Sequence, residues 1–260
     1  MSVIALQMYT MRRHMGSKEE LAETLHRVAD IGYQAVQITP PGFVTLPEMR
    51  RMLDETGLRA DSVLAHSTKL DEEYDDVLRA AEILGTDVVR LDGISHELAQ
   101  SEEGYHTYAA MLERGGQRFR AAGLSMYYHF HAFEWVNFPD GRRGIDILLD
   151  ETSPEAVGFQ PDIYWLAAAG TEPSDSLRRF AGRARYMHVK DYGITLRTGA
   201  MENVPRTFAA VGKGNLNLPA IVKTAREIGI EEYCVEQDEC SGDVFACIEE
   251  SYKGLKTLGI

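Results

Sequence analysis

The feature that most constrains the fold is an alternation of strand-like and helix-like segments that runs through the whole chain. Eight short apolar runs, each typical of a buried strand, lie at residues 3–9, 33–39, 59–67, 87–93, 124–131, 156–165, 184–191 and 231–238. A segment with helical spacing of its apolar residues follows each of them. Repeated units of this kind build a parallel sheet covered by helices, and eight of them suit a closed barrel better than an open sheet. We therefore predict an α/β fold, a (β/α)₈ TIM barrel.

Local signals mark where the helices begin and end. Ser17 with Glu20, and Thr45 with Glu48, have the spacing of a capping box at a helix start. A glycine closes each of these two segments, as expected at a helix C-terminus. Because no low-complexity linker or break in composition separates the eight units, residues 1–260 are expected to form a single domain.

Composition and charge argue against several classes of function. The chain has 260 residues and a net charge of −13, which disfavours nucleic acid and anionic membrane surfaces as partners. No apolar run approaches the roughly 20 residues of a membrane helix. The N-terminal charges follow the first apolar run, which is the wrong order for a secretion signal, so we expect a cytoplasmic protein. The glycine patterns of dinucleotide-binding and phosphate-binding loops are also missing.

Residues able to bind metals or transfer protons gather at the ends of the last four strand-like runs. They are His129, His131 and Glu134 at the fifth run, Asp162 at the sixth, His188 and Lys190 at the seventh, and Glu236 at the eighth. Catalytic groups of a (β/α)₈ barrel lie at the carboxyl ends of its strands. Side chains alternate along a strand, so His129 and His131 share one face. If such faces point inward, four consecutive strands direct ligand-type side chains to one place.

Charge balance favours a metal ion at this place. Carboxylates that converge on a buried site repel one another unless protonation or a cation neutralises them. One divalent ion, with imidazole from His188 as a nitrogen ligand, satisfies this condition. Ligation by carboxylate and imidazole without thiolate suits Mn²⁺ as the first choice, with Mg²⁺, Co²⁺ and Zn²⁺ as alternatives. Such an ion stabilises the enediolate that forms when a proton leaves a carbon next to a carbonyl.

Each of these residues also has a purely structural interpretation. A single histidine near a strand end is more often hydrogen-bonded packing than a ligand, which applies to His66 and His129 taken alone. Asp162 can cap the next turn, and Glu236 can pair with a lysine. Trp165 is equally compatible with stacking on a sugar and with packing at the rim. The convergence on four successive strands favours a metal site over these alternatives.

Six stretches appear in the order expected of one known family. They are LQMYTMR, YYHFHAFEW, GFQPDIYW, YMHVKDY, VGKGNL and VEQDE, and together they span nearly the whole chain. With them the sequence resembles the sugar-phosphate isomerase/epimerase family of xylose-isomerase-like TIM barrels, which includes ketose 3-epimerases, inosose dehydratase and hydroxypyruvate isomerase. The motifs HVKD, VEQD and HxHxxE are fairly specific for the family, but none of them identifies a substrate.

The resemblance implies one divalent cation held by a Glu-Asp-His-Glu set near the upper mouth of the barrel. It implies Asp162, His188 and Glu236 as three of the ligands. In the ketose 3-epimerases the strand-five ligand is a glutamate within the strand, and that position is similar to His129 here. Glu134 belongs to the HxHxxE variant, and we take it as the fourth ligand, with His129 as the alternative.

Two departures from the family pattern concern the substrate. Gln37 stands where many relatives carry a strand-two glutamate. Trp165 replaces the histidine that ketose epimerases place after the strand-six aspartate. A standard ketose 3-epimerase activity is therefore less expected than the family resemblance alone suggests.

The resemblance predicts a metal-dependent isomerase or epimerase acting on a sugar, keto-sugar or polyol, or on its phosphate. The expected catalytic residues are Glu134, Glu236, His131 and Lys190. A carboxylate of the site or His131 would abstract a proton next to a carbonyl, and Lys190 would bind the enolate oxygen. Contacts to the substrate are expected from Tyr9, Gln37, His66, His129 and Trp165.

Other hypotheses stay open. A lyase or dehydratase acting on a keto-sugar or inosose shares the same first step. A DNA-repair endonuclease of the same superfamily needs more ligands in the early strands and a basic face, which the acidic charge disfavours. A sugar-binding or partner subunit can retain the barrel without catalysis, and a metal-free barrel can use the polar cluster structurally. The sequence leaves open the substrate, the identity of the metal and the oligomeric state, a homo-oligomer included.

Overall fold

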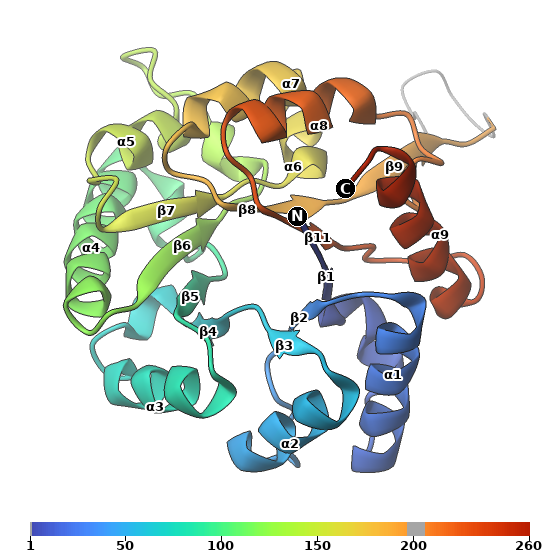
Figure 1. Ribbon diagram of the computed structural model, residues 1–260. Helices are drawn as coiled ribbons and strands as arrows, with labels where there is room; N and C mark the ends of the chain where they lie inside the picture. Colours follow the sequence, from blue (N-terminus) through green and yellow to red (C-terminus); the bar gives the residue numbers. More distant parts are fainter. Residues whose placement is uncertain (1, 197–205) are drawn as a thin grey trace.

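Parallel strands form a closed ring at the centre of the protein. The computed structural model describes residues 2–196 and 206–260 (Figure 1). One run of paired strands has the order β3-β2-β1-β11-β8, and a second has the order β4-β5-β6-β7. Their bounds are β1 Val3–Gln7, β2 Ala35–Gln37, β3 Arg59–Ala60, β4 Val63–Ala65, β5 Val88–Leu91, β6 Ser125–His129, β7 Val157–Gln160, β8 Tyr186–Val189 and β11 Glu232–Val235.

Two junctions join these runs into a barrel of eight positions. At the first, β3 and β4 are separated only by Asp61 and Ser62, so together they form the third position of the ring. At the second, a parallel bridge pairs Asp162, just after β7, with His188 of β8. The second junction therefore brings two of the predicted metal ligands side by side. The (β/α)₈ fold predicted from the alternation of the sequence is confirmed.

Helices surround the ring on its outside, as Figure 1 shows. Their bounds are α1 Lys18–Ile31, α2 Leu46–Thr56, α3 Tyr74–Leu84, α4 Glu102–Ala121, α5 Gly144–Asp150, α6 Ile163–Ala168, α7 Pro173–Ser176, α8 Leu218–Glu227 and α9 Val244–Thr257. The capping box of Thr45 and Glu48 forms completely. Ser17 caps α1, but the carboxylate of Glu20 accepts from the Gly16 N–H instead. Among the helices of the described residues, none is long and apolar enough to cross a membrane.

Alternation along the strands separates an apolar outer face from an inner face that becomes polar toward the carboxyl ends. Ala5, Ala35 and Cys234 lie next to one another in register and form a small apolar cluster of their own. Two residues further along the first two of these strands come Gln7 and Gln37, both buried. The intervening residues of the same strands belong to the main apolar core. This inner face supplies the polar site described below.

Two segments differ from the sequence expectation. In the sixth run, residues 156–165, the strand was expected to end at Asp162, but β7 ends at Gln160 and α6 begins at Ile163. Asp162 caps that helix, and a backbone turn there ends the strand. After β8 the chain forms an antiparallel hairpin of β9 Asp191–Ile194 and β10 Arg206–Ala209, which the alternation of strands and helices did not predict. The residues of this hairpin lack the helical spacing of apolar residues, so the alternation of strands and helices does not reveal them.

Close packing of α4 against the segment before β7 gives a test of the fold. A Cβ atom at Gly116 would overlap the backbone of Ala156, whereas a Cβ at Gly115 meets Leu70 Cδ1 at 2.8 Å, the end of a flexible side chain. We expect Gly116→Ala to lower the free energy of unfolding by roughly 2 kcal/mol, because backbone must move. The matched control Gly115→Ala should change the free energy of unfolding by about 1 kcal/mol or less. Both variants gain the same helix propensity, so the difference between them reports the contact with the Ala156 backbone. Urea unfolding followed by circular dichroism measures both, and equal effects would contradict the packing described.

Candidate active site

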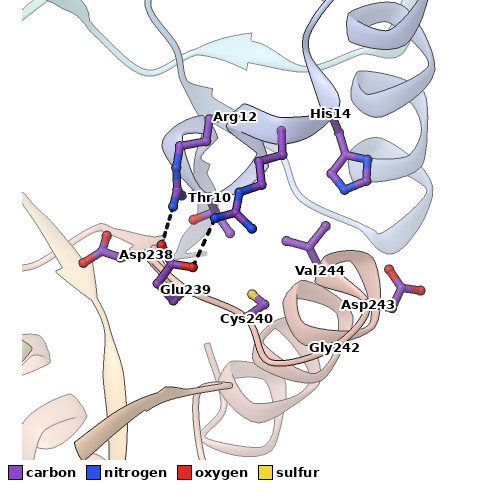
Figure 2. Close-up of a pocket in the computed structure, with 10 residues that line it drawn as sticks. Thr10, Arg12, His14, Asp238, Glu239, Cys240, Gly242, Asp243 and Val244 are labelled. Carbon is purple, nitrogen blue, oxygen red and sulfur yellow. Dashed lines mark hydrogen bonds and ion pairs between the residues drawn. The ribbon is translucent and has the colours of Figure 1, made fainter.

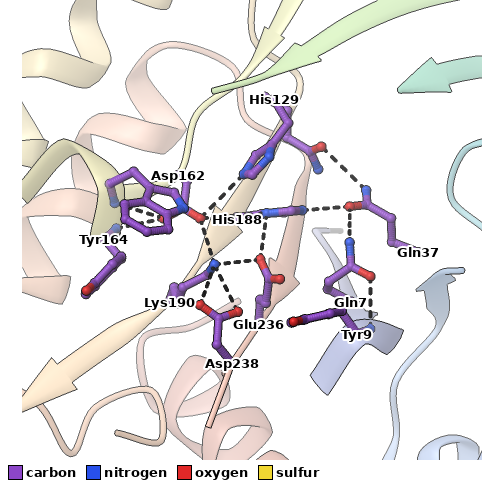
Figure 3. A network of polar contacts seen from close by, with 12 residues as sticks. Gln7, Tyr9, Gln37, His129, Asp162, Tyr164, His188, Lys190, Glu236 and Asp238 are labelled. Atoms are coloured by element: carbon purple, nitrogen blue, oxygen red, sulfur yellow. Dashed lines mark hydrogen bonds and ion pairs between the residues drawn. The ribbon is translucent and has the colours of Figure 1, made fainter. Parts of the chain in front are cut away.

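Four buried side chains from four neighbouring positions of the ring converge at the carboxyl ends of the strands. His129 ends β6, Asp162 follows β7, His188 lies in β8 and Glu236 follows β11. Each offers one nitrogen or oxygen atom, and these four atoms all lie within 4.8 Å of one another. Figure 3 shows the side chains directed toward a common point. The strand-end positions predicted for Asp162, His188 and Glu236 are brought together, with His129 as the fourth member.

The converging atoms fit a cation because none of them makes a hydrogen bond, although the Lys190 ammonium lies near the two carboxylate oxygens. His129 Nε2, Asp162 Oδ2, His188 Nδ1 and Glu236 Oε2 are buried and make no hydrogen bond. Asp162 Oδ2 lies 3.5 Å from His129 Nε2 and 3.8 Å from His188 Nδ1, and Glu236 Oε2 lies 3.0 Å from His188 Nδ1. Buried polar atoms without partners are rare because each costs about 1–3 kcal/mol. Two carboxylates and two imidazoles are a ligand set for a divalent ion.

Asp162 has both roles that the sequence left open. Its Oδ1 accepts from the N–H groups of Tyr164 and Trp165, at 2.9 and 3.2 Å, and so caps the start of α6. Its Oδ2 is left free to face the other ligand-type atoms (Figure 3). Burial raises the pKa of Asp162, but Lys190 and His129 outweigh burial and hold that pKa well below its usual range. The cap fixes the carboxylate in one orientation without using the oxygen that faces the site.

Hydrogen bonds around Gln37 determine which nitrogen of His188 is available. Gln37 Nε2 donates to both carboxylate oxygens of Asp61, at 3.1 and 3.0 Å, which fixes the orientation of its amide. Gln37 Oε1 then accepts from Gln7 Nε2 at 2.7 Å and lies 2.7 Å from His188 Nε2. An amide oxygen can only accept, so His188 Nε2 carries a hydrogen, and Nδ1 is the ring nitrogen that faces Asp162 and Glu236. Gln37, predicted as a substrate contact, lines the cavity and also orients a ligand-type histidine.

Lys190 places a positive charge among three carboxylates. Its ammonium nitrogen lies 2.9 Å from Glu236, 3.4 Å from Asp162 and 3.3 Å from Asp238, and the residue is 2% exposed. Burial lowers the pKa of Lys190, but the facing carboxylates outweigh it and raise that pKa. Burial also raises the pKa of Glu236, and His188 and Lys190 outweigh that effect and depress it. Lys190 alone leaves these carboxylates with an excess of negative charge that a cation would balance.

The two histidines of β6 differ in their surroundings. Their rings lie 4.8 Å apart, edge to face, as expected for residues on one face of a strand. Burial, with the nearby His188, lowers the pKa of His129 to about 3, so its ring is neutral and able to bind a metal. His131 lies beyond the strand end, stacked on Phe133 with ring centroids 5.2 Å apart. Burial lowers the pKa of His131 as well, which leaves it a neutral base at physiological pH.

Glu134, predicted as the fourth ligand, is not part of the converging group. Its carboxylate is buried in a short 3₁₀ turn, where it accepts from the Tyr128 hydroxyl and, at 2.9 Å, from the backbone N–H of His131. Burial raises the pKa of Glu134 to about 7. In the arrangement described here, His129 takes the position that the sequence assigned to Glu134, and Glu134 fixes the turn that carries His131.

A cavity of about 520 Å³ opens beside the four ligand-type atoms. Residues from seven of the eight strand positions line it, among them Gln7, Tyr9, Arg12, Gln37, Leu64, Arg90, Asp92, His129, His131, His188 and Glu236. Tyr9 is 53% exposed at its mouth, which suits the predicted substrate contact. His66 does not line the cavity; it is exposed and its ring lies 2.9 Å from Glu73. Trp165 lies behind the cavity wall, 5.4 Å from the Lys190 ammonium and 5.2 Å from the His131 ring.

Three polar residues of the site were not identified from the sequence. Asp238 pairs with Lys190, and Gln7 supports Gln37. Arg90 lines the cavity from the middle of β5. Gln7 ends β1 but lies before the end of the strand-like run 3–9, and Arg90 lies within β5, so only their inward parity could have marked them.

A second hollow, of about 270 Å³, adjoins the first between the turn after β1 and the start of α9 (Figure 2). Arg12 lines both spaces and is held by Glu239 Oε1 at 2.9 Å and by the Tyr9 carbonyl oxygen at 3.0 Å. Arg13 reaches the same carboxylate at 3.6 Å. Both arginines of this hollow therefore pair with one carboxylate, and the ligand-type atoms that make no hydrogen bond belong to the first cavity.

Comparison with known proteins now places the chain in a family. A family model described as xylose isomerase-like TIM barrel matches residues 25–239. The chain belongs to this family. A curated relative, the inosose dehydratase of Geobacillus kaustophilus, is 25% identical over 193 residues, which cover 65% of this chain and 61% of that protein. The chain thus spans less than two thirds of that relative's length.

Solved structures extend the similarity of this xylose isomerase-like barrel over nearly the whole chain. A sugar phosphate isomerase/epimerase from Parabacteroides distasonis has a TM-score of 0.80 at 22% identity, covering 98% of this chain and 93% of that one. A xylose isomerase-like TIM barrel protein from Mycobacterium smegmatis, solved in complex with magnesium, has a TM-score of 0.71 at 17% identity, covering 99% and 95%. At these identities the structures support the fold alone.

The choice between His129 and Glu134 as fourth ligand can be measured directly. We expect the protein to bind one Mn²⁺, with His129→Ala weakening the affinity by roughly ten-fold or more, because loss of even an outer-shell partner costs that much. Glu134→Gln should leave the affinity close to that of the wild type, since its carboxylate is engaged by Tyr128 and His131. Free Mn²⁺ is followed by electron paramagnetic resonance during titration. A larger loss in the glutamate variant would return that role to Glu134.

The buried carboxyl of Glu134 predicts a pH dependence of stability in metal-free protein. Its pKa in the folded state is about 7, above the ordinary 4.5. The folded state therefore holds the proton more tightly, and this contribution to stability is lost as the pH rises from about 4.5 through 7. Relative to Glu134→Gln, the wild type should lose on the order of 1–2 kcal/mol of unfolding free energy between pH 5 and 8. Urea unfolding in chelator across this range tests it, and parallel profiles would contradict it.

Proposed function

We propose that this protein is a divalent-metal-dependent isomerase or epimerase that removes a proton next to the carbonyl of a sugar, keto-sugar or polyol-derived ketone. The observation that carries the proposal is the group of four buried nitrogen and oxygen atoms that make no hydrogen bond and lie beside an open cavity. A polyhydroxylated substrate fits a cavity whose lining is rich in amide, imidazole, guanidinium and carboxylate groups.

The metal would be held by His129, Asp162, His188 and Glu236. When bound, a divalent ion supplies Lewis-acid stabilisation of negative charge on substrate oxygens. Mn²⁺ remains our first choice because carboxylate and imidazole ligands suit it, and Mg²⁺ is supported by the magnesium complex of a structural neighbour. Gln37 and the capping bonds of Asp162 would keep the ligand atoms in place before the substrate arrives.

His131 is the residue best suited to move the proton. Its ring lines the cavity next to His129, and its Nδ1 has no hydrogen-bond partner. Because burial lowers its pKa, the imidazole is neutral and can accept a proton from a carbon acidified by the adjacent carbonyl. Glu134 acts on this residue indirectly by holding its backbone N–H, which makes Glu134 a positioning residue.

Lys190 and Glu236 would manage charge as the reaction proceeds. The Lys190 ammonium, fixed between carboxylates beside the site, would offset part of the negative charge that develops on the enolate oxygen. Glu236 lines the cavity as well as belonging to the ligand group, so its carboxylate can accept a hydrogen bond from a substrate hydroxyl. Return of the proton to the other carbon, with transfer of the hydroxyl proton to the former carbonyl oxygen, completes an isomerisation. Its return to the opposite face of the same carbon completes an epimerisation.

A dehydratase is the second candidate, and the curated relatives favour it. The inosose dehydratase relative shares 25% identity with this chain over 193 residues. The first step is the same proton abstraction, after which the enolate expels a hydroxyl group from the next carbon instead of being reprotonated. Protonation of that hydroxyl by His131, which received the proton in the first step, would make the elimination neutral overall.

Isotope exchange tests the proposal. We expect the Mn²⁺-loaded protein to exchange deuterium from solvent into the carbon next to the carbonyl of at least one ketose or inosose in a broad panel. Chelator should abolish exchange, and His131→Asn should slow it by roughly a hundred-fold or more, the usual contribution of a general base. Nuclear magnetic resonance follows the exchange, and mass spectrometry separates isomers from dehydrated products.

The exposed histidine His66 provides the control. His66→Gln should exchange at the wild-type rate, because that ring faces Glu73 and not the cavity. Exchange that survives complete removal of the metal would contradict the metal-dependent mechanism. Absence of exchange with the whole panel, in protein that binds the metal, would favour a sugar-binding subunit over an enzyme.

A further inference from the structure

Arg90 is a buried arginine at the cavity without a partner of its own. It lies in β5, opposite Leu64 of β4 and Tyr127 of β6, and is 8% exposed. Its side chain lines the cavity beside His129 and His131, and its Nε is buried without a hydrogen bond. Among residues 2–196 and 206–260, no group forms an ion pair or hydrogen bond with its guanidinium.

The acidic groups nearest in the barrel interior are already engaged elsewhere. Asp61, which shares a small space with Arg90, accepts two hydrogen bonds from Gln37 and one from Ser62. Glu232 pairs with Arg59 at the opposite end of the barrel. Asp92 lines the cavity at its exposed mouth and makes no ion pair with Arg90 in the described part of the chain. The charge of Arg90 is thus left for something that enters the cavity.

A buried arginine without an ion-pair partner needs an anion to balance its charge. The guanidinium does not lose its proton in proteins, so burial cannot be relieved by neutralisation. An unpaired buried charge is costly, and the cost is removed when an anion binds. The planar fork of the guanidinium matches a carboxylate, with which it forms two parallel hydrogen bonds. The cavity lining also includes the carboxylates of Asp92 and Glu236, so a singly charged anion is repelled less than a dianion.

We propose that the substrate is a sugar acid or related keto acid whose carboxylate binds Arg90 while its reacting carbons face His131. This inference rests on the proposed function, because it takes the same cavity as the place of reaction. A carboxylate is chosen over a phosphate because a single guanidinium serves it, whereas a phosphate dianion would face the acidic lining with no second cation free in the described residues around this cavity. Arg12 and Lys190 are paired with carboxylates.

Three matched probes test the substrate class on the full-length, Mn²⁺-loaded protein by isothermal titration calorimetry. They are D-arabino-hex-2-ulosonate, D-fructose and D-fructose 1-phosphate. These share one carbon skeleton and differ at carbon 1, which is a carboxylate in the first, a hydroxymethyl group in the second and a phosphorylated hydroxymethyl group in the third. We expect the carboxylate to bind roughly ten-fold or more tightly than the neutral sugar, as is usual for a charge-assisted pair. The phosphate should bind more weakly than the carboxylate.

Variants of Arg90 and Arg12 show which arginine is responsible for the tighter binding of the carboxylate. Arg90→Met should abolish the difference between carboxylate and neutral sugar, and Arg90→Lys should retain part of it because the charge stays but the fork is lost. Arg12→Met is the matched control, since Arg12 lines the same cavity but is held by Glu239, and it should keep the preference. If Arg90→Met does not fold, the wild-type comparison and Arg90→Lys still decide.

The outcomes separate this inference from the proposed function. Equal binding or no binding of the carboxylate and the neutral sugar by metal-loaded wild type overturns the carboxylate assignment, as does a preference that survives in Arg90→Met. Tighter binding of the phosphate also overturns it. The proposed function fails separately, through protein that binds no Mn²⁺ or through exchange that does not depend on the metal.

Discussion

Three carboxylates and two imidazoles can share the interior of this barrel only because Lys190 lies among them. Its ammonium contacts Asp162, Glu236 and Asp238 within 3.4 Å; Asp162 follows β7, and the other two acids follow β11. Without a fixed positive charge, burial would protonate these acids or force the strand ends apart. The single lysine does not balance all of them. The remaining negative charge, with four atoms at its centre that make no hydrogen bond, supports the proposal that the site holds a cation.

The ring of strands determines the chemistry through neighbours that are remote in sequence. Gln37 and His188 are far apart along the chain but 2.7 Å apart in space, because β1 connects β2 to β11 and β8. A neutral amide at this position orients the imidazole without adding another negative charge to an acidic interior. The same neutrality matters for Arg90, since a carboxylate in place of Gln37 would offer it a partner. The absence of an ion pair at Arg90 thus agrees with a neutral amide at residue 37, because both residues line the same cavity.

Much of the fold and part of the site follow from the sequence alone. The strand-helix alternation was sufficient for the barrel, and parity with strand-end position was sufficient to bring Asp162, His188 and Glu236 together. The position of Glu134 was not accessible in this way, because the residues after β6 turn in a 3₁₀ segment whose direction depends on the Tyr128 hydroxyl. The contact by which Gln37 orients His188 could not be predicted either, because it depends on which strands become neighbours when the ring closes. Arg90 was overlooked because its importance lies in the absence of a partner, which no sequence pattern displays.

The HxHxxE run at the end of β6 divides three functions among three residues by a change of backbone geometry. His129 is the last residue of the strand, so its ring points inward to the ligand group. His131 comes after the strand has ended, and its ring stacks on Phe133 and lines the cavity without joining the ligand group. The turn that makes this difference is closed by Glu134 through the backbone N–H of His131. In the proposed mechanism, a carboxylate at that position therefore contributes to proton transfer by holding His131, the base, beyond the end of the strand.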